Sequence, residues 1–369
     1  MDQPRSGQVS EAMFNRRQVL MGGVGGVASM LLWPRSGLAK KKAKSDTLTL
    51  LIWPDYLDPG VIEAFEQQRG MKVKQVFFES DTERDQLLVK KGGDAFDLMV
   101  VNRINLPFYA RQGWIAPVDR NRLKGLDRID PRWIAEPDSA ANLWGVPYFW
   151  GNIGLAYRED RLIAPPASWM DFFRPAEMLR GRIQAMESDR ELIGMALKAL
   201  GHSVNSEDGA ALSAAETLLM EQKPHVKSFR YIELGPDSPL VTGEVWMAMV
   251  FNGDALKLRE HHESIRYIQP REGSALWVDD LALGSNASGH ELALDFLNFL
   301  LDPAMALRNA EALHFATPNR EALRLASKGY LDNAAIFPGE ELLQRSETVR
   351  PVSPRTQRRI NDIVARLLK

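Results

Sequence analysis

A tryptophan, a carboxylate and a tyrosine stand together in LIWPDY, residues 51–56 of this chain. The preceding β-branched residues and leucines predict a strand over 47–53, which the proline ends. Ligands of an open α/β sheet bind beyond the carboxyl ends of its strands, so this position is suited to ligand binding. The alternative is that Trp53 and Tyr56 pack into the core while Asp55 begins a turn.

Motifs typical of catalysis are scarce in this sequence. The absence of cysteine excludes disulfides, iron–sulfur clusters and thiolate chemistry. The six histidines have no metal-binding helical spacing, and no G-x-S-x-G, P-loop or G-x-G-x-x-G motif occurs. We therefore expect neither a cofactor nor a metal site, and an exported enzyme is the weaker interpretation.

The length and composition are those of a folded chain with about two domains. Of its 369 residues, 45% are hydrophobic and 25% are charged, which is ordinary for a globular protein. The formal net charge of -2 provides no basic field for nucleic acid. We therefore expect no nucleic-acid partner.

The N-terminus has the parts of a signal peptide. Arg16 and Arg17 precede an uncharged run over 19–34, and GLA at 37–39 is a small-x-small cleavage pattern. The run is too short to span a bilayer comfortably. We expect residues 1–39 to be a signal peptide, whose arginine pair favours the twin-arginine route over the general secretory one. The mature, mildly acidic chain would then work outside the cytoplasm.

Strand and helix patterns alternate along the first third of the mature chain. After the first strand come a helix in PGVIEAFEQQRG, a strand in MKVKQVFF, and a helix opened by a capping box from Ser80 to Glu83. A short apolar strand follows over 97–101. This order predicts a parallel α/β sheet with its ligand edge at 53–56 and 101–104.

A second α/β region follows an aromatic, glycine-rich segment that becomes a strand over 153–157. A helix starts at Ser188, and a strand runs into a helix across FNGD. The strand in ALWVDDLALG has Trp277 and Asp279 near its middle. The C-terminal segment predicts a capped amphipathic helix. Its inner stripe is Ile360, Ile363, Val364 and Leu367.

Several stretches, in this order, resemble the periplasmic polyamine-binding proteins, the spermidine- and putrescine-binding subunits of ABC importers. The likeness covers roughly 46–340 and is carried by LIWPDYLDPGVIEAFEQQRGMKV, DAFDLMVV, VPYFWGNIGLAYRED, FNGDALKLRE, ALWVDDLAL and HFATPN. It implies an α/β fold of two lobes that are joined by crossover strands and enclose a ligand cleft. The implied lobes are 45–152 with 279–323 and 153–278 with 324–369. The resemblance also implies a periplasmic monomer that delivers its ligand to an ABC transporter permease.

The implied pocket holds a linear amine between aromatic rings, and carboxylates take its ammonium ends. An ammonium group over a ring face gains about 0.5–2 kcal/mol, and a charge-assisted hydrogen bond adds about 1.5–3 kcal/mol. Each residue also has an ordinary role: buried rings can be core residues, Glu191 suits the first turn of a helix, and Asp254 can cap one. The candidate ligand-binding residues are Trp53, Asp55, Tyr56, Asn102, Glu191, Phe251, Asp254, Trp277, Asp279 and Phe315.

The sequence departs from the spermidine-type pattern at two cleft positions. Ile104 stands where those family members carry a tyrosine, and Ser188 stands where they carry an acid. Asp254 resembles the putrescine-type members, so we expect a diamine rather than a longer polyamine. Two alternatives stay open. One is a sensor that reports the ligand to a membrane receptor, and the other is a binder of zwitterions or anions with Arg103 or Arg190 in the cleft.

Overall fold

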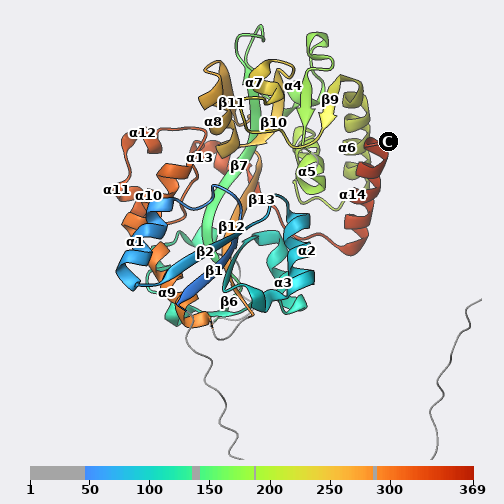
Figure 1. Ribbon diagram of the computed structural model, residues 1–369. Coiled ribbons are helices and arrows are strands. Elements are labelled where there is room, and N and C mark those ends of the chain that lie inside the picture. The colour runs from blue at the N-terminus through green and yellow to red at the C-terminus, as the bar shows by residue number, and fades with distance from the viewer. Residues whose placement is uncertain (1–45, 135–141, 187, 286–288) are drawn as a thin grey trace, which may run out of the picture. The chain divides into compact units, whose positions relative to one another are not determined.

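The computed structural model describes residues 46–134, 142–186, 188–285 and 289–369 (Figure 1). The predicted signal peptide lies outside the described residues. The described residues all belong to a single compact unit. None of the helices in the described part of the chain has the length and apolarity that a membrane crossing requires.

A mixed sheet of eleven strands forms the centre of the described residues. Its main path has the order β2-β1-β3-β12-β7-β10-β8-β9, while β4 and β13 pair with β12, and β11 pairs with β7. The strands of this sheet are β1 (Thr47–Ile52), β2 (Lys72–Phe77), β3 (Leu98–Asn102), β4 (Ile115–Ala116), β7 (Val146–Arg158), β8 (Ile183–Ala185), β9 (Val226–Phe229), β10 (Met247–Phe251), β11 (Ile265–Ile268), β12 (Ala275–Gly284) and β13 (Glu347–Thr348). A separate antiparallel pair joins β5 (Val118–Asp119) to β6 (Asn142–Leu143).

Strands β7 and β12 run antiparallel through the middle of this sheet and belong to both of its halves. On one side β12 pairs with β3, and β1 is parallel to β2 and β3. On the other side β7 pairs with β10, and β8 is parallel to β9 and β10. We name the half with β1 lobe 1 and the half with β10 lobe 2. The predicted α/β fold with two lobes joined by crossover strands is confirmed.

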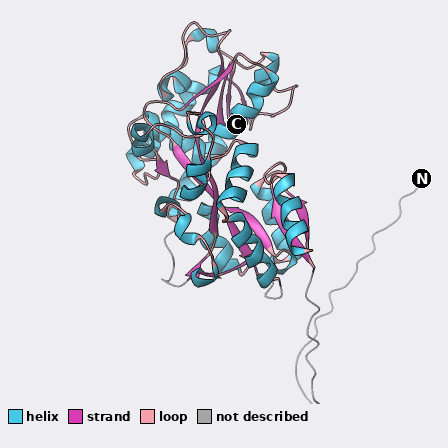
Figure 2. Ribbon diagram, turned by 90° about the vertical axis from the view of Figure 1, so that its left-hand side faces the viewer, coloured by secondary structure: helices cyan, strands magenta, loops and turns pink. Residues whose placement is uncertain are grey.

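Helices lie on both sides of the strands (Figure 2), and every residue of β7 and β12 is accordingly buried. In lobe 1, α1 packs on β2 and α10, and α9 packs on β12. In lobe 2, α5, α6 and α14 pack on one another, and the predicted apolar stripe of α14 is buried. The helices are α1 (Pro59–Arg69), α2 (Asp81–Lys91), α3 (Leu106–Gln112), α4 (Trp169–Phe173), α5 (Asp189–Ala199), α6 (Gly209–Gln222), α7 (Pro239–Thr242), α8 (Asn252–His261), α9 (His290–Leu300), α10 (Pro303–Leu313), α11 (Arg320–Leu325), α12 (Lys328–Leu331), α13 (Glu340–Arg345) and α14 (Pro354–Leu367).

Strand β7 is longer than the sequence predicts. The strand expected over 153–157 is only the second half of a continuous strand that begins at Val146. The glycine in WGN does not break it, because that glycine makes room for a neighbouring side chain. A Cβ atom at Gly151 would lie 2.4 Å from a ring carbon of Trp277. The prediction was wrong because a glycine weakens a strand unless another side chain fills the space that its missing side chain leaves.

The predicted helix ends are confirmed in most details. Helix α1 begins after Asp58, whose side chain caps its first turn, and ends at Gly70 with φ of 64°. At α2 the Ser80 side chain accepts a hydrogen bond from the Glu83 backbone N–H at 3.1 Å. The Glu83 carboxylate, however, accepts from the backbone N–H of Glu79 at 2.7 Å. Half of the capping box predicted between Ser80 and Glu83 is therefore formed, and its reciprocal bond is shifted by one residue to Glu79.

Candidate functional site

A hydrogen bond between distant parts of the chain lies at the centre of the site. The Tyr56 hydroxyl donates to the Asp279 carboxylate at 2.8 Å, and both side chains are buried, at 7% and 8% exposure. Strand β12 places Asp279 opposite Asn102 at the end of β3, while the loop after β1 carries Tyr56. The site therefore lies where the carboxyl ends of β1 and β3 adjoin the crossover strand β12.

Aromatic rings extend from this pair toward lobe 2. The Phe315 ring lies 5.1 Å from that of Tyr56 and 5.7 Å from that of Trp277, measured between centroids. Phe251 continues the row at 6.1 Å from Trp277, and Phe149 lies 5.5 Å from Phe315. These distances are typical of favourable aromatic contacts, so the rings form one continuous apolar wall.

A second carboxylate, that of Asp254, is also held by a tyrosine. The Tyr231 hydroxyl donates to Asp254 and accepts from the backbone N–H of Phe251 at 3.3 Å. The Tyr231 and Phe251 rings lie 5.6 Å apart. Asp254 does not cap α8, because the N-cap position of that helix belongs to Phe251. The capping role that the residue type also suggests is therefore not found for Asp254.

The third predicted acid, Glu191, lies in the first turn of α5. The Ser188 hydroxyl donates to Glu191 and makes no cap bond to the helix backbone. Burial raises the pKa of Glu191, and the charge of Asp81, at the start of α2, adds to this rise. The same Asp81 charge adds to the rise in the pKa of Asp279. Glu191 and Asp279 therefore both lie within electrostatic reach of Asp81.

All three acids lie in surroundings that disfavour their negative charge. Burial raises the pKa of Asp279 to about 7, and it also raises the pKa of Asp254 and of Glu191. No lysine or arginine nitrogen of the described residues lies within 4.0 Å of any of these carboxylates. A ligand that brings positive charge would therefore stabilise their ionised forms.

The two arginines that an anionic ligand could use are engaged elsewhere. Arg103 makes two hydrogen bonds to the buried Asp280, at 2.9 and 2.7 Å. Asp280 follows Asp279 on β12, at the point where the register of pairing with β7 shifts. One nitrogen of Arg190 donates to the backbone oxygen of Arg350 at 2.9 Å, and its buried Nε has no hydrogen-bond partner among the described residues. The contacts of Arg103 give no support to a zwitterion or anion held by that residue.

The remaining candidates, Trp53, Asn102 and Asp55, have other contacts. The half-buried Trp53 packs its ring 4.4 Å from that of Phe78. The Asn102 side chain accepts from the backbone N–H of Ile104 at 3.3 Å, beside Asp279 in the sheet. Asp55 is exposed and has the left-handed φ of 51°. Within the described residues no hydrogen bond or ion pair joins Asp55 or Glu191 to Asp254 or to the Tyr56–Asp279 pair, so the structure does not bring either acid into that group.

Two residues of the site are not evident in the sequence. Phe149 belongs to a run of three rings in VPYFWG, and only the pairing of Phe149 with Asp279 across β7 and β12 selects it. Tyr231 lies between β9 and α7, where no motif marks it. We name the acid–aromatic cluster by its members: Tyr56, Phe149, Tyr231, Phe251, Asp254, Trp277, Asp279 and Phe315. In the part of the chain that the structure describes, no group of acids and histidines is arranged to hold a metal ion.

Comparison with known proteins gives consistent matches over most of the chain. A family model described as bacterial extracellular solute-binding protein matches residues 60–338. The spermidine/putrescine-binding periplasmic protein of Salmonella typhimurium is 31% identical over 311 residues, which cover 84% of this chain and 88% of that protein. The norspermidine sensor of Vibrio cholerae is 29% identical over 304 residues, covering 82% and 83%. The crystal structure of the spermidine/putrescine ABC transporter substrate-binding protein PotD from Streptococcus pneumoniae matches with a TM-score of 0.79 at 26% identity, covering 88% of this chain and 99% of that one.

Proposed function

The chain belongs to the bacterial extracellular solute-binding proteins, and we propose that it is the polyamine-binding subunit of an ABC importer. The Salmonella and Streptococcus relatives, named for spermidine and putrescine, support this proposal. One observation carries it above the others. Asp279 is a buried carboxylate that a tyrosine holds and aromatic rings flank, and no cationic side chain among the described residues pairs with it.

An ammonium group would complete this arrangement. It would gain about 1.5–3 kcal/mol from a charge-assisted hydrogen bond and about 0.5–2 kcal/mol from an aromatic face. Each ligand methylene buried against the rings adds about 0.8 kcal/mol. Micromolar affinity requires only about -8.2 kcal/mol. The three acids and the rings can supply this after the costs of ordering the ligand and closing the lobes.

The two acids held by tyrosines favour a short amine. Burial raises the pKa of Tyr56, and the charges of Asp279 and Asp254 add to the rise. A diamine can place one ammonium group at each of these acids. At the positions where a longer polyamine would need further contacts, Ile104 offers no polar group and the Ser188 hydroxyl is used by Glu191. We therefore propose a diamine such as putrescine as the preferred ligand.

Capture would proceed by closure of the lobes about β7 and β12. Tyr56 and Asp279 would belong to lobe 1, and Phe251 and Asp254 to lobe 2. An amine that contacts both sets binds the closed form more tightly and shifts the population toward it. The proposed lobes are 45–152 with 279–323 and 153–278 with 324–369. The boundaries at 152/153 and 278/279 fall within the crossover strands β7 and β12, and the boundary at 323/324 falls within α11.

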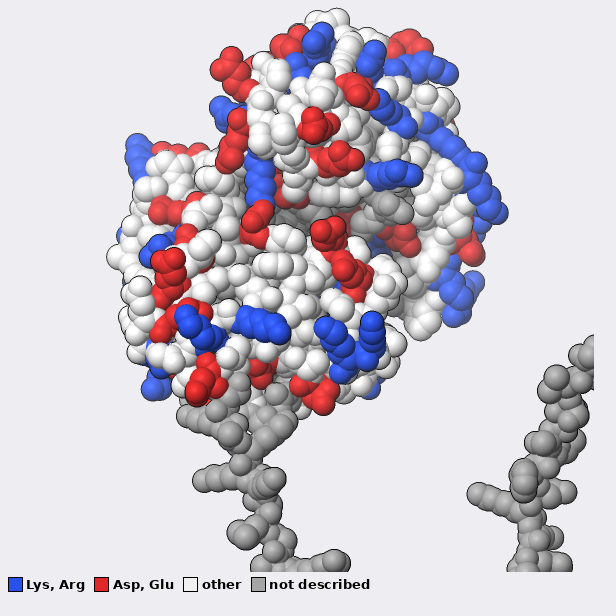
Figure 3. Space-filling model, in the orientation of Figure 1, with Lys and Arg blue, Asp and Glu red and all other residues white. Residues whose placement is uncertain are grey.

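The proposal includes the setting in which the protein works. We propose export through the signal peptide predicted over 1–39, action in the periplasm as a monomer, and delivery of the ligand to an ABC permease. It includes no catalytic step, because the relatives are binding proteins. It includes no nucleic-acid partner either. On the face drawn in Figure 3, lysines and arginines are interspersed with acids rather than gathered in a basic field.

Sensing is the second candidate function, because one relative is named a norspermidine sensor. A sensor would use the same acids and rings and would differ in its membrane partner. Capture of the purified protein by a permease or by a receptor domain separates the two roles. Neither outcome changes the ligand that the acid–aromatic cluster is expected to hold.

Calorimetric titration of the purified protein with putrescine, and separately with spermidine, tests the proposed function. Micromolar binding of either amine is the expected result, with putrescine the tighter ligand. An amino acid such as 4-aminobutyrate serves as the zwitterionic control and should produce no binding heat. Binding of the zwitterion without binding of either polyamine would overturn the proposal.

A further inference from the structure

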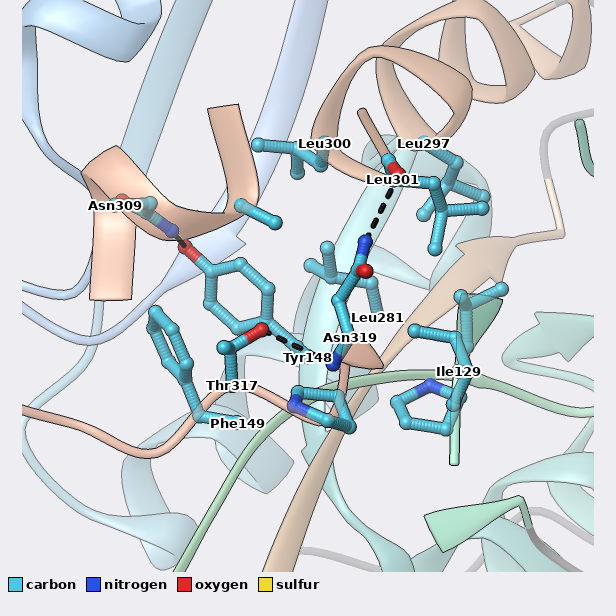
Figure 4. A pocket seen from close by; sticks show the side chains of 14 residues that line it. Ile129, Tyr148, Phe149, Leu281, Leu297, Leu300, Leu301, Asn309, Thr317 and Asn319 are labelled. Atoms are coloured by element: carbon cyan, nitrogen blue, oxygen red, sulfur yellow. Dashed lines mark hydrogen bonds between the residues drawn. The ribbon is translucent and has the colours of Figure 1, made fainter. Parts of the chain in front are cut away.

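The loop that carries Tyr56 is fastened by two buried polar side chains, which Figure 4 shows beside a small cavity. The Tyr148 hydroxyl on β7 donates to the backbone oxygen of Tyr56 at 2.7 Å. It accepts in turn from the side-chain amide of Asn309 on α10 at 2.8 Å. The oxygen of that amide accepts from the backbone N–H of Asp58 at 2.9 Å. Asn309 thus holds the loop directly at Asp58 and, through Tyr148, at Tyr56.

Hydrogen bonds add to packing in fixing the Tyr148 side chain, whose ring lies 4.1 Å from that of Phe149. A cavity of about 20 Å³ lies beside its ring and is lined mostly by apolar side chains (Figure 4), so the ring is not enclosed tightly on that side. Tyr148 and Asn309 are 7% and 1% exposed, and a buried polar group without a partner is costly. The hydroxyl and the amide therefore hold one another, and the loop, in a single arrangement.

Asn309 also connects this loop to an aromatic ring of the cluster. Helix α10 ends at Leu313, His314 takes the left-handed φ of 57°, and Phe315 follows. The Phe315 ring then lies 5.1 Å from that of Tyr56. The Tyr56 loop and the helix that leads to Phe315 are thus joined by one buried amide.

We propose that Tyr148 and Asn309 are positioning residues of the acid–aromatic cluster, which hold the 56–58 loop so that the Tyr56 hydroxyl stays on Asp279. They act through Tyr56 and not on the ligand. The consequence for ligand affinity rests on the proposed polyamine function. The expected change in the Asp279 pKa does not depend on that function, so the positioning role and the polyamine function can be tested separately.

Tyr148→Phe tests the proposal, because it keeps the ring and removes only the hydroxyl. A released loop lets the Tyr56 hydroxyl leave Asp279, whose carboxylate then loses a donor that lowers its pKa. An NMR titration of ¹³C-labelled aspartate in the ligand-free protein should show the Asp279 pKa raised by about half a unit or more. Calorimetry should show putrescine binding weakened by about tenfold. The variant leaves in place the other charged groups that act on Asp279, which are Asp81, Arg84 and Asp280.

Tyr157→Phe is the matched control, since it removes a hydroxyl from a buried ring on the same strand (4% exposed). It should change neither the Asp279 pKa nor the affinity. Asn309→Leu is the second test variant and should repeat both effects of Tyr148→Phe. An unchanged Asp279 pKa in both folded variants would overturn the proposal. Loss of folding in both would also overturn it, because the role would then be purely structural. If the wild-type protein binds no polyamine, the proposed function fails, and the titration still decides the positioning role.

Discussion

The Tyr56 hydroxyl donates a hydrogen bond to Asp279 although the two residues lie 223 positions apart in the sequence. The bond joins the loop after β1 to the crossover strand β12. Burial raises the pKa of Asp279, the hydrogen bond from Tyr56 partly offsets this rise, and the resulting pKa is about 7. The hydrogen bond from Tyr56 therefore keeps a larger fraction of the Asp279 carboxylate ionised than burial alone would allow.

Asp279→Asn should weaken putrescine binding by tenfold or more, about 1.4 kcal/mol. The amide keeps the shape of the side chain and can still accept from Tyr56, but it offers an ammonium group no charge. Calorimetry measures the change, and Asp237→Asn, which alters an exposed acid, is the control. Normal affinity in Asp279→Asn would mean that the amine binds elsewhere.

Polyamine affinity should fall as the pH is lowered from about 8 to about 6. The pKa of Asp279 is about 7, and burial also raises the pKa of Asp254 and of Glu191. Acidification therefore neutralises the acids, while the ligand amines, with pKa values near about 10, stay charged. Titrations at fixed ionic strength measure the profile, and Asp279→Asn should flatten it. A flat wild-type profile would contradict a role for these acids.

The stability of the ligand-free protein should change with pH in the opposite sense. The Asp279 pKa is about 7 in the folded state and near its ordinary 3.8 in the unfolded chain, so the folded state keeps a proton that the unfolded state has lost. This carboxyl therefore lowers stability as the pH rises from about 4 to about 7, and the loss is complete above that window. A bound amine offsets it. Putrescine should raise the Tm more at pH 8 than at pH 5.5, and an equal shift at both pH values would argue against the assignment.

Arg103→Ala should lower the free energy of unfolding by about 3–5 kcal/mol, because it leaves the buried Asp280 carboxylate without its cation. Putrescine affinity of the folded variant should stay near that of the wild type. Urea denaturation measures the stability, with Arg111→Ala, a change at an exposed arginine, as the control. Loss of ligand binding without loss of stability would instead place Arg103 in the ligand site.

Local sequence signals predicted the elements whose causes are local. The cap and the glycine stop of α1, the stripe of α14 and the strand around WVDD all lie where their own residues indicate. The extent of β7 could not be predicted in this way. Its glycine at position 151 is compatible with a strand only because Trp277, far along the sequence, fills the space above it.

The same distinction holds for the site. The order of the sequence motifs predicted that Trp277 and Asp279 lie on a strand and that Asp254 lies where a strand passes into a helix, as observed. In the structure, aromatic rings and tyrosine hydroxyls connect these three residues. Phe149 enters only through the register between β7 and β12. Asp55 stays outside, because its left-handed backbone belongs to an exposed turn. Neither register nor turn conformation is readable from residue types in a single sequence.

Ile104→Tyr combined with Ser188→Asp should shift the selectivity from putrescine toward spermidine. Ile104 is half-buried beside Asn102, and Ser188 is exposed next to Glu191. The substitutions supply a polar ring and a carboxylate for the additional amine, and one charge-assisted hydrogen bond is worth about 1.5–3 kcal/mol. The ratio of the two dissociation constants should therefore move toward spermidine by about tenfold or more. Ile104→Phe with Ser188→Asn controls for size without adding charge. If both double variants change the ratio equally, pocket shape rather than charge sets the ligand length.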